Sequence, residues 1–244
     1  MRSVVGGVAV AWLAAGFGYC AEGGKSAGEQ DTPTSPTFMY VSGGDWWRNG
    51  AFFHAGVLWS PQGIYHDGFT FKLLTGTGTY RYHSGAVAAE VTGTVVLGAL
   101  MPGWRFKLDQ LEITVVAGLD LQNHRLLPDD PDSRTRGFHA GARAGADLWY
   151  EPLPQLMLAA NVSVSTIGPG FWTRAAAGWR VFDKFWLGPE VLALGDPTYR
   201  QLRVGIHGTS LKTGSFEWSA GAGFVEDSDR RGGYYIRLGV LTRR

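Results

Sequence analysis

The sequence has a single cysteine, Cys20, among its 244 residues, so one chain cannot form an internal disulfide. Charged residues make up only 18% of it, and the formal net charge is +1. This balance leaves no basic footprint for nucleic acid, and no zinc-ligand spacing or nucleic-acid-binding motif is found, so a nucleic-acid partner is excluded. After the N-terminus no uncharged apolar run approaches the roughly 20 residues that a membrane-spanning helix needs.

The first 21 residues have the pattern of an export signal. Arg2 gives a positive start, Val4 to Phe17 form an apolar stretch, and Cys20-Ala21 provide a small-residue end. The stretch is short for an anchor helix, and Phe17-Gly18-Tyr19 lacks the small residues expected before a lipid-carrying cysteine. We therefore predict a signal peptide over residues 1–21 and export through the inner membrane of a Gram-negative bacterium.

A polar segment follows the signal and precedes the fold. Residues 22–37 are rich in Gly, Ser, Thr and Pro, which is typical of a flexible leader. Residues 38–244 are then predicted to form one domain.

Two features dominate this domain. Glycine is abundant, with 36 residues in the chain, and apolar residues alternate with small or polar ones at every second position. Glycine disfavours helix interiors, whereas alternation of apolar with small or polar residues is typical of a β-strand with unlike faces. Phe216, Trp218 and Ala220, for example, alternate with Glu217 and Ser219. The pattern predicts about twelve strands, near Phe38–Ser42, Ala51–Trp59, Gly68–Tyr82, Ala86–Leu100, Gln110–Asp120, Phe138–Tyr150, Leu156–Ile167, Phe171–Val181, Phe185–Leu194, Tyr199–Gly208, Ser215–Val225 and Tyr234–Leu241.

These strands predict a closed antiparallel up-and-down β-barrel of the outer-membrane type. Most are close to the 9 to 11 residues of a tilted membrane-spanning strand, and only a closed sheet pairs every backbone group in lipid. Longer connections at Leu121–Gly137, Gly43–Gly50 and Glu226–Gly233 would face outside, as in outer-membrane barrels. The inner connections would be Ser60–Asp67, Met101–Lys107, Glu151–Pro154 and Phe182–Lys184.

In this barrel the apolar faces would contact lipid and the polar faces would line an interior partly filled by ion pairs. The predicted lumen-lining residues are Glu112, Asp120, Arg143, Asp147, Asn161, Arg174, Arg180, Arg203, His207, Glu217 and Arg237. Aromatic residues near the strand ends are assigned to the girdles of the membrane interfaces, namely Trp46, Trp47, Trp59, Trp104, Trp149, Tyr150, Trp172, Trp186 and Tyr199. A soluble sandwich or lipocalin-like barrel is the structural alternative, with the faces reversed.

No catalytic residue, metal site or cofactor is predicted. Alternation places His207, Glu217 and Ser219 on one face, but no nucleophile turn accompanies them, so a Ser-His-acid enzyme is disfavoured. Gly76-Thr77-Gly78 lies within a strand, where close packing explains it better than a phosphate loop does. Trp46 and Trp47 are candidates for stacking on the sugar rings of a glucan, with the aromatic girdle as the competing interpretation.

Several short motifs together resemble the BcsS family of bacterial cellulose biosynthesis proteins. They are Gly43-Gly44-Asp45-Trp46-Trp47-Arg48-Asn49-Gly50-Ala51-Phe52, Asp67-Gly68-Phe69-Thr70-Phe71-Lys72-Leu73-Leu74, Tyr80-Arg81-Tyr82, Pro102-Gly103-Trp104-Arg105-Phe106-Lys107, Ala146-Asp147-Leu148-Trp149-Tyr150-Glu151-Pro152, Leu187-Gly188-Pro189-Glu190 and the closing Arg237–Arg244. The resemblance implies an accessory role in making, exporting or anchoring cellulose, and it supplies no catalytic residues.

The sequence therefore favours a non-enzymatic outer-membrane β-barrel that assists cellulose biosynthesis. Its expected partners are outer-membrane lipid, cellulose and other components of the cellulose synthase apparatus. Two alternatives stay open at this point: an outer-membrane enzyme acting on lipid or polysaccharide, and a soluble periplasmic glucan-binding barrel.

Overall fold

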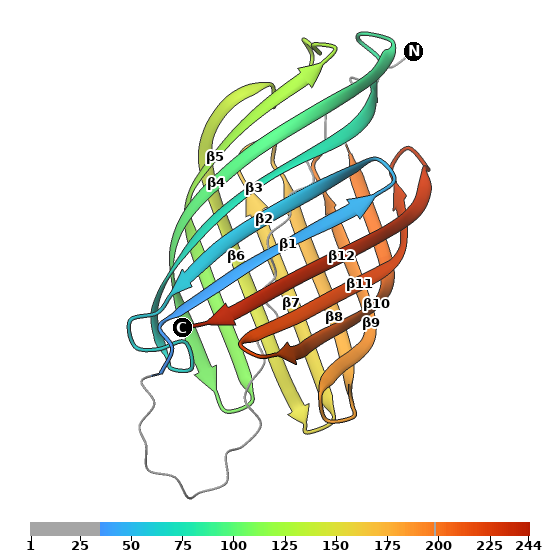
Figure 1. The fold of residues 1–244 in the computed structure, drawn as a ribbon. Coiled ribbons are helices and arrows are strands. Elements are labelled where there is room, and N and C mark those ends of the chain that lie inside the picture. The colour runs from blue at the N-terminus through green and yellow to red at the C-terminus, as the bar shows by residue number, and fades with distance from the viewer. Residues whose placement is uncertain (1–34, 198) are drawn as a thin grey trace, which may run out of the picture.

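The computed structural model describes residues 35–197 and 199–244, and the regular elements in this part of the chain are all β-strands. The strands are β1 Phe38–Trp47, β2 Gly50–Trp59, β3 Gly68–Ser84, β4 Ala89–Leu108, β5 Leu111–Leu127, β6 Gly137–Leu153, β7 Leu156–Ser165, β8 Phe171–Val181, β9 Phe185–Gly195, β10 Arg200–Thr213, β11 Phe216–Asp227 and β12 Gly232–Arg243. Each pairs antiparallel with its sequence neighbours, and β1 pairs with β12 to close the barrel (Figure 1). The predicted twelve-stranded up-and-down barrel is confirmed.

The barrel has two ends that differ in their connections. At the terminal end, Phe38 and Arg244 exchange backbone hydrogen bonds of 2.8 and 2.9 Å, and the connections after even-numbered strands lie there. The connections after odd-numbered strands lie at the opposite end, called the outer end below. Within the described residues, no helix has the length and apolar character required to span a bilayer.

The start of the described chain is attached to the terminal end. Thr37 donates its backbone N–H to the Arg244 carbonyl (2.9 Å), and the Ile64 N–H donates to Pro36 (2.8 Å). The last residues of the predicted leader are therefore held against the barrel. The predicted signal, residues 1–21, and the leader up to residue 34 lie outside the described residues.

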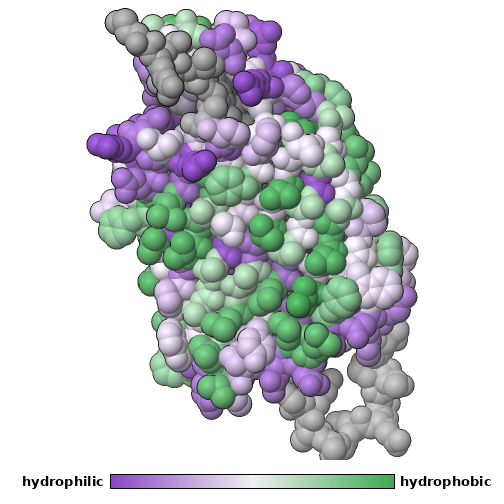
Figure 2. Space-filling model, turned by 180° about the vertical axis from the view of Figure 1, so that it is seen from behind, coloured by the Kyte–Doolittle hydropathy of each residue, from purple (hydrophilic) through white to green (hydrophobic). Residues whose placement is uncertain are grey.

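The outward and inward faces follow the alternation of the sequence. Along β3, inward side chains are buried and alternate with outward ones, as in Thr70, Lys72 and Leu74 against Phe71 and Leu73. Apolar residues gather over the middle of the face seen in Figure 2, with hydrophilic residues toward both ends. Because the apolar faces point outward, the barrel is of the outer-membrane type and not the soluble alternative.

The Gly76-Thr77-Gly78 segment provides close packing, as predicted. A Cβ atom at Gly76 or Gly78 would lie 2.6 or 2.5 Å from ring atoms of Phe52 on the neighbouring β2. Two glycines therefore leave room for an inward aromatic ring. Thr77 between them faces outward and donates its hydroxyl to the Val95 carbonyl (3.0 Å).

Strand lengths differ strongly around the barrel. β3 to β6 have 17 to 20 residues, whereas β1, β2 and β7 have 10 each. In Figure 1, β3, β4 and β5 rise beyond β1 and β2 at the outer end and form a one-sided wall.

Strands continue into several predicted connections: β5 runs to Leu127 within Leu121–Gly137, and β6 runs to Leu153 within Glu151–Pro154. Two further predicted connections are mostly strand. Met101–Lys107 belongs to β4: the ladder from β4 to β5 resumes in unchanged register at Gly103 and Val116, although Pro102 cannot donate a hydrogen bond. The predicted loop Gly43–Gly50 mostly belongs to β1, which runs to Trp47 before a turn at Arg48-Asn49. Glycine and proline suggested breaks in both segments, but the alternation of faces persists through them.

The residues predicted for the aromatic girdle are divided between the outward face and the inside of the barrel. Trp46, Trp59, Trp104 and Tyr150 point outward and are 36% to 46% exposed. Five other predicted girdle residues are not outward: Trp149, Trp172 and Trp186 are buried inside the barrel, and Trp47 and Tyr199 lie at its outer mouth. Nearness to a strand end does not decide the face, since only the parity along the strand does.

Candidate functional site

The interior of the barrel is crossed by charged side chains in ion pairs. Predicted lumen residues that are buried are Glu112, Asp120, Arg143, Asp147, Asn161, Arg174, Arg203, His207 and Glu217, while Arg237 and Arg180 are partly exposed. The pairs are Arg143 with Asp120 (3.1 Å), Arg203 with Asp45 (2.9 Å), Lys72 with Asp147 (3.1 Å), Arg174 and Arg237 with Glu190 (2.8 Å each), Arg180 with Glu151 (3.4 Å), Lys107 with Glu112 and Arg243 with Glu217.

Several partners in these pairs escaped the sequence analysis. Asp45 and Lys107 fell in segments assigned to connections, and Lys72 and Glu190 stood out only as parts of family motifs. Their odd or even position along the strand could have shown that they face inward. Asp45, for example, alternates with Gly44 and Trp46, which lie on the outward face of β1. Glu190 also accepts the Tyr235 hydroxyl (3.0 Å), so it joins three strands, β8, β9 and β12.

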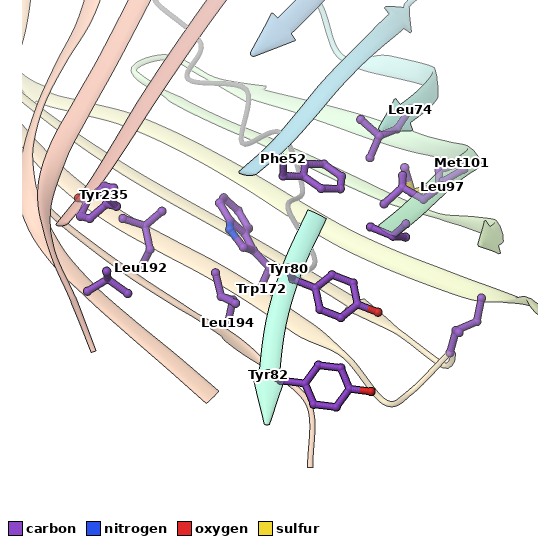
Figure 3. Packing of buried hydrophobic residues seen from close by; sticks show 14 of the residues in the cluster. Phe52, Leu74, Tyr80, Tyr82, Leu97, Met101, Trp172, Leu192, Leu194 and Tyr235 are labelled. Atoms are coloured by element: carbon purple, nitrogen blue, oxygen red, sulfur yellow. The ribbon is translucent and has the colours of Figure 1, made fainter. Parts of the chain in front are cut away.

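The interior is less polar than predicted. A large apolar cluster includes Phe52, Tyr80, Trp172, Leu192 and Tyr235, which reach inward from strands on different sides of the barrel (Figure 3). β4 contributes inward Val91, Val95, Leu97 and Met101. Because β4 is apolar on both faces over much of its length, alternation did not reveal which face was inward.

The terminal end is closed by a second cluster and a folded connection. Met39, Leu58, Trp149, Met157 and Trp186 pack together inside the barrel. In the connection from β2 to β3, Ile64 is only 1% exposed, and its carbonyl accepts a hydrogen bond from the buried Arg105. An interior cavity between Lys72, Arg143 and Asp147 holds about 10 Å³, which is room for about one water molecule.

The structure does not assemble the Ser-His-acid arrangement considered from the sequence. His207 Nδ1 lies 2.9 Å from the Thr209 hydroxyl, and its Nε2 lies 3.1 Å from the Ala177 carbonyl oxygen. Glu217 bonds to Arg243, and Ser219 is paired across the ladder with Thr209. Among the described residues, no group of three or more His, Cys, Asp or Glu side chains is arranged to hold a metal ion.

Trp46 and Trp47 lie on opposite faces of β1. Trp46 is outward, 39% exposed, and makes an edge contact with Phe53 at 5.1 Å between ring centroids. Trp47 is inward, and the Arg203 guanidinium lies 4.8 Å from the centre of its ring. The predicted glucan-stacking pair is therefore divided between the outer surface and the mouth of the barrel.

Trp47 lines a small, mostly enclosed recess at the outer end, called the mouth recess below. Its free volume is about 10 Å³. The lining residues are Trp47, Asn49, Tyr80, Arg81, Tyr82, Tyr199 and Gln201.

Hydrogen bonds fix the residues around the mouth recess. The Asp227 carboxylate accepts the Asn49 amide (3.3 Å), the Tyr199 hydroxyl (3.4 Å) and the Arg231 Nε (3.1 Å). Gln201 donates its amide to the Tyr199 hydroxyl oxygen (3.2 Å). Burial raises the pKa of Tyr199 above its usual range, and the nearby Asp227 charge raises it further, so this hydroxyl stays protonated and able to donate.

On the other side of the mouth recess, β3 supplies two stacked tyrosines. The rings of Tyr80 and Tyr82 lie 6.3 Å apart at 25°. The Tyr82 hydroxyl donates to the buried Asp130 (2.8 Å), and the Tyr80 hydroxyl lies 3.3 Å from His124 Nδ1. The connection after β5 thus contacts the β3 side of the mouth recess.

Comparison with known proteins gives one family match and several similar folds. The model of the family described as "cellulose biosynthesis protein BcsS" matches residues 39–244. The KdgM porin is 10% identical, with 84% of this chain and 98% of the porin covered and a TM-score of 0.46. The transport unit of the autotransporter AIDA-I from Escherichia coli is also 10% identical, with 88% of this chain and 92% of the transport unit covered and a TM-score of 0.48. The translocator domain of the autotransporter NalP from Neisseria meningitidis is 11% identical, with 88% of this chain and 90% of that domain covered and a TM-score of 0.46. No curated protein matches the chain.

Proposed function

Because the chain belongs to the cellulose biosynthesis protein BcsS family, we propose that it is a non-enzymatic accessory barrel in the outer membrane that serves cellulose biosynthesis, export or anchoring. The observation that carries this proposal is the distribution of its faces. Apolar side chains point outward around a closed sheet, and charged side chains are paired inside it.

This distribution suits a bilayer. A closed antiparallel sheet pairs its own backbone groups, and an apolar outer face suits acyl chains. Trp46, Trp59, Trp104 and Tyr150 are exposed on the outward face and would lie at the membrane interfaces. With the terminal end toward the periplasm, the wall formed by β3, β4 and β5 would project outside the cell.

The filled interior favours a positional role over conduction of polymer. Ion pairs and the two apolar clusters occupy the barrel, and its terminal end is capped around Ile64. A sugar ring is much larger than the water-sized cavity beside Lys72. The barrel would therefore hold its outer end at the cell surface, in reach of secreted cellulose and of other components of the cellulose synthase apparatus.

Cell fractionation combined with gel mobility tests the proposal. A folded outer-membrane barrel is expected in the outer-membrane fraction, with a mobility shift on boiling. In planar bilayers the purified chain is expected to give no steady conductance comparable to a porin. A soluble periplasmic protein would contradict the membrane assignment, and a large stable conductance would contradict the positional role.

A further inference from the structure

We propose that the outward face of β3, β4 and β5 near the outer end binds a phosphate group of an outer-leaflet lipid, through the side chains of Arg81 and Arg125. This inference rests on the proposed function, because only a barrel in the outer membrane brings lipid to this face. The residues themselves supply the site, since two positive side chains without carboxylate partners stand at the border of the apolar belt, on the wall that these strands form (Figure 1).

The two arginines differ from the other arginines of the strands. Most strand arginines point inward and pair with a carboxylate, as Arg143 does with Asp120. Arg81 and Arg125 instead lie on the outward face and are exposed. Within the described part of the chain, neither of them makes an ion pair. Their charges are therefore available to an anionic ligand.

The two arginines lie close enough to share one ligand. Arg81 is paired across the ladder with Thr92 on β4, and Arg125 is paired with Thr94 on the same strand. From the usual spacing of strands and of residues along a strand, the two arginine Cα atoms lie about 12 Å apart on one face of the sheet. The threonine hydroxyls between them can donate to phosphate oxygens. The backbone of Arg81 is fixed, since its N–H donates to the Asn49 carbonyl (2.8 Å).

The height of the site matches the headgroup region of a bilayer. The outward positions of β4 are apolar without interruption at Val96, Gly98, Leu100, Pro102, Trp104 and Phe106. From Val96 to Phe106 a strand tilted by about 40° spans about 25 Å along the membrane normal, which is the height of the apolar band of outer-membrane barrels. Thr94 is the next outward residue, so it and Arg125 opposite stand at the outer border of this band.

The neighbouring residues favour an anion at this face. Along β3, β4 and β5, Glu90 is the one outward acidic residue, and it lies further from the apolar band, opposite His83. At the outer ends of β11 and β12 the outward residues include Phe224 and Tyr234, whose rings are in contact at 4.9 Å. A phosphorylated glycolipid of the outer leaflet therefore meets its counter-charge at the face of β3, β4 and β5. Guanidinium groups suit this ligand because they bond phosphate oxygens in a fork geometry.

Calorimetric titration of the full chain in detergent micelles with bis-phosphorylated lipid A tests the site. Dephosphorylated lipid A controls for binding of the acyl chains, and EDTA removes divalent cations that could bridge phosphates. The wild-type chain is expected to bind the phosphorylated lipid at least about tenfold more tightly than the dephosphorylated one.

Substitutions at single positions separate this face from the general charge of the outer end. Arg81→Gln and Arg125→Gln are each expected to weaken binding of phosphorylated lipid A about tenfold, the loss of roughly one charge-assisted contact. Arg125→Lys keeps the charge and is expected to lose less than Arg125→Gln does. Arg134→Gln removes the same charge from the exposed connection after β5 and is expected to leave binding unchanged.

Heat-modifiable mobility of each variant confirms that it is folded before its binding is interpreted. Equal binding of the two lipids, an equal loss for Arg134→Gln, or full binding by a folded chain that carries both Arg81→Gln and Arg125→Gln would overturn the site. Inorganic phosphate that binds as tightly as phosphorylated lipid A would overturn the lipid as its occupant. Any of these results with a barrel that does fractionate with the outer membrane leaves the proposed function standing, whereas absence of the barrel from the outer membrane would overturn the proposed function.

Discussion

Replacing Glu190 by glutamine removes a carboxylate that two interior arginines share. Its Oε2 lies 2.8 Å from both Arg174 Nε and Arg237 Nη2, and its Oε1 accepts the Tyr235 hydroxyl at 3.0 Å. The glutamine keeps the shape and one acceptor oxygen but leaves the two guanidinium groups without this counter-charge. Removing one partner of a buried ion pair costs about 3–5 kcal/mol, and we expect a loss near the lower value because the amide oxygen still accepts one hydrogen bond.

Urea unfolding of the barrel in lipid vesicles, followed by tryptophan fluorescence, measures this loss. With a slope of about 1–3 kcal/mol per molar urea, a loss of about 3 kcal/mol moves the midpoint down by about 1–3 M. Arg237→Gln is expected to lower the free energy of unfolding less in the Glu190→Gln variant than in the wild-type chain. In that variant the carboxylate that pairs with Arg237 is already absent.

An exposed ion pair supplies the matched control. Asp129 and Arg136 lie 2.6 Å apart in the connection after β5, with side chains 66% and 47% exposed. Asp129→Asn is expected to cost no more than about 1 kcal/mol. A midpoint for Glu190→Gln that equals the Asp129→Asn value would refute the reasoning that the interior ion pairs stabilise the barrel.

Two further substitutions probe the packing and the outward face. Gly78→Val brings a side chain against the Phe52 ring and should lower the free energy of unfolding by about 1–3 kcal/mol, as measured by urea unfolding. Adding Phe52→Leu to the same chain should recover part of the lost stability. Val191→Arg, near the middle of β9 on the outward face, should cost about 2–4 kcal/mol in vesicles if the face meets acyl chains, whereas Val191→Leu should be close to neutral. A cost near zero for Val191→Arg would count against the membrane assignment.

Strand number and pairing were predictable because the alternation is nearly continuous. β8, Phe171–Val181, has the predicted bounds, and the closing pair of β1 with β12 follows from a barrel without edges. Bounds were less predictable where the strands are longest. β4 continues to Leu108 past Pro102-Gly103, since pairing with two long neighbours holds a segment whose own residues favour a break.

The faces were predictable only where their chemistry differs. Asp147 and Asn161 lie opposite each other on paired strands and share one hydrogen bond of 2.9 Å, as alternation implies. Trp149 follows Asp147 at the same parity and is buried, although its place near a strand end suggested the girdle. The odd or even position along a strand therefore predicted the face of a residue better than its nearness to a strand end did. Where both faces of a strand are apolar, as in β4, this position did not show which face is inward.

The mouth recess was not predictable, because its residues come from distant parts of the chain. Trp47 was a candidate, but Tyr199, Asn49 and Gln201 carry no local signal of a shared site. They meet because the turn after β1, the connection after β9 and the end of β11 all reach the outer end, where Asp227 bonds to two of them. Alternation predicts which side of a strand a residue occupies, but the heights of separate strands depend on the barrel's stagger.

The same stagger links the closed interior to the mouth recess. Arg203 lies between Asp45 (2.9 Å), the Trp47 ring (4.8 Å) and the Tyr235 ring (5.4 Å), and its Nε donates to Gln201 (2.7 Å). An interior ion pair thus positions two of the residues that line the mouth recess. Because Tyr235 also bonds to Glu190, a change in the interior charges should reach the outer mouth through side chains in direct contact. The filled barrel is on this account also the support of its outer mouth, and opening it for conduction would disturb the residues around the mouth recess.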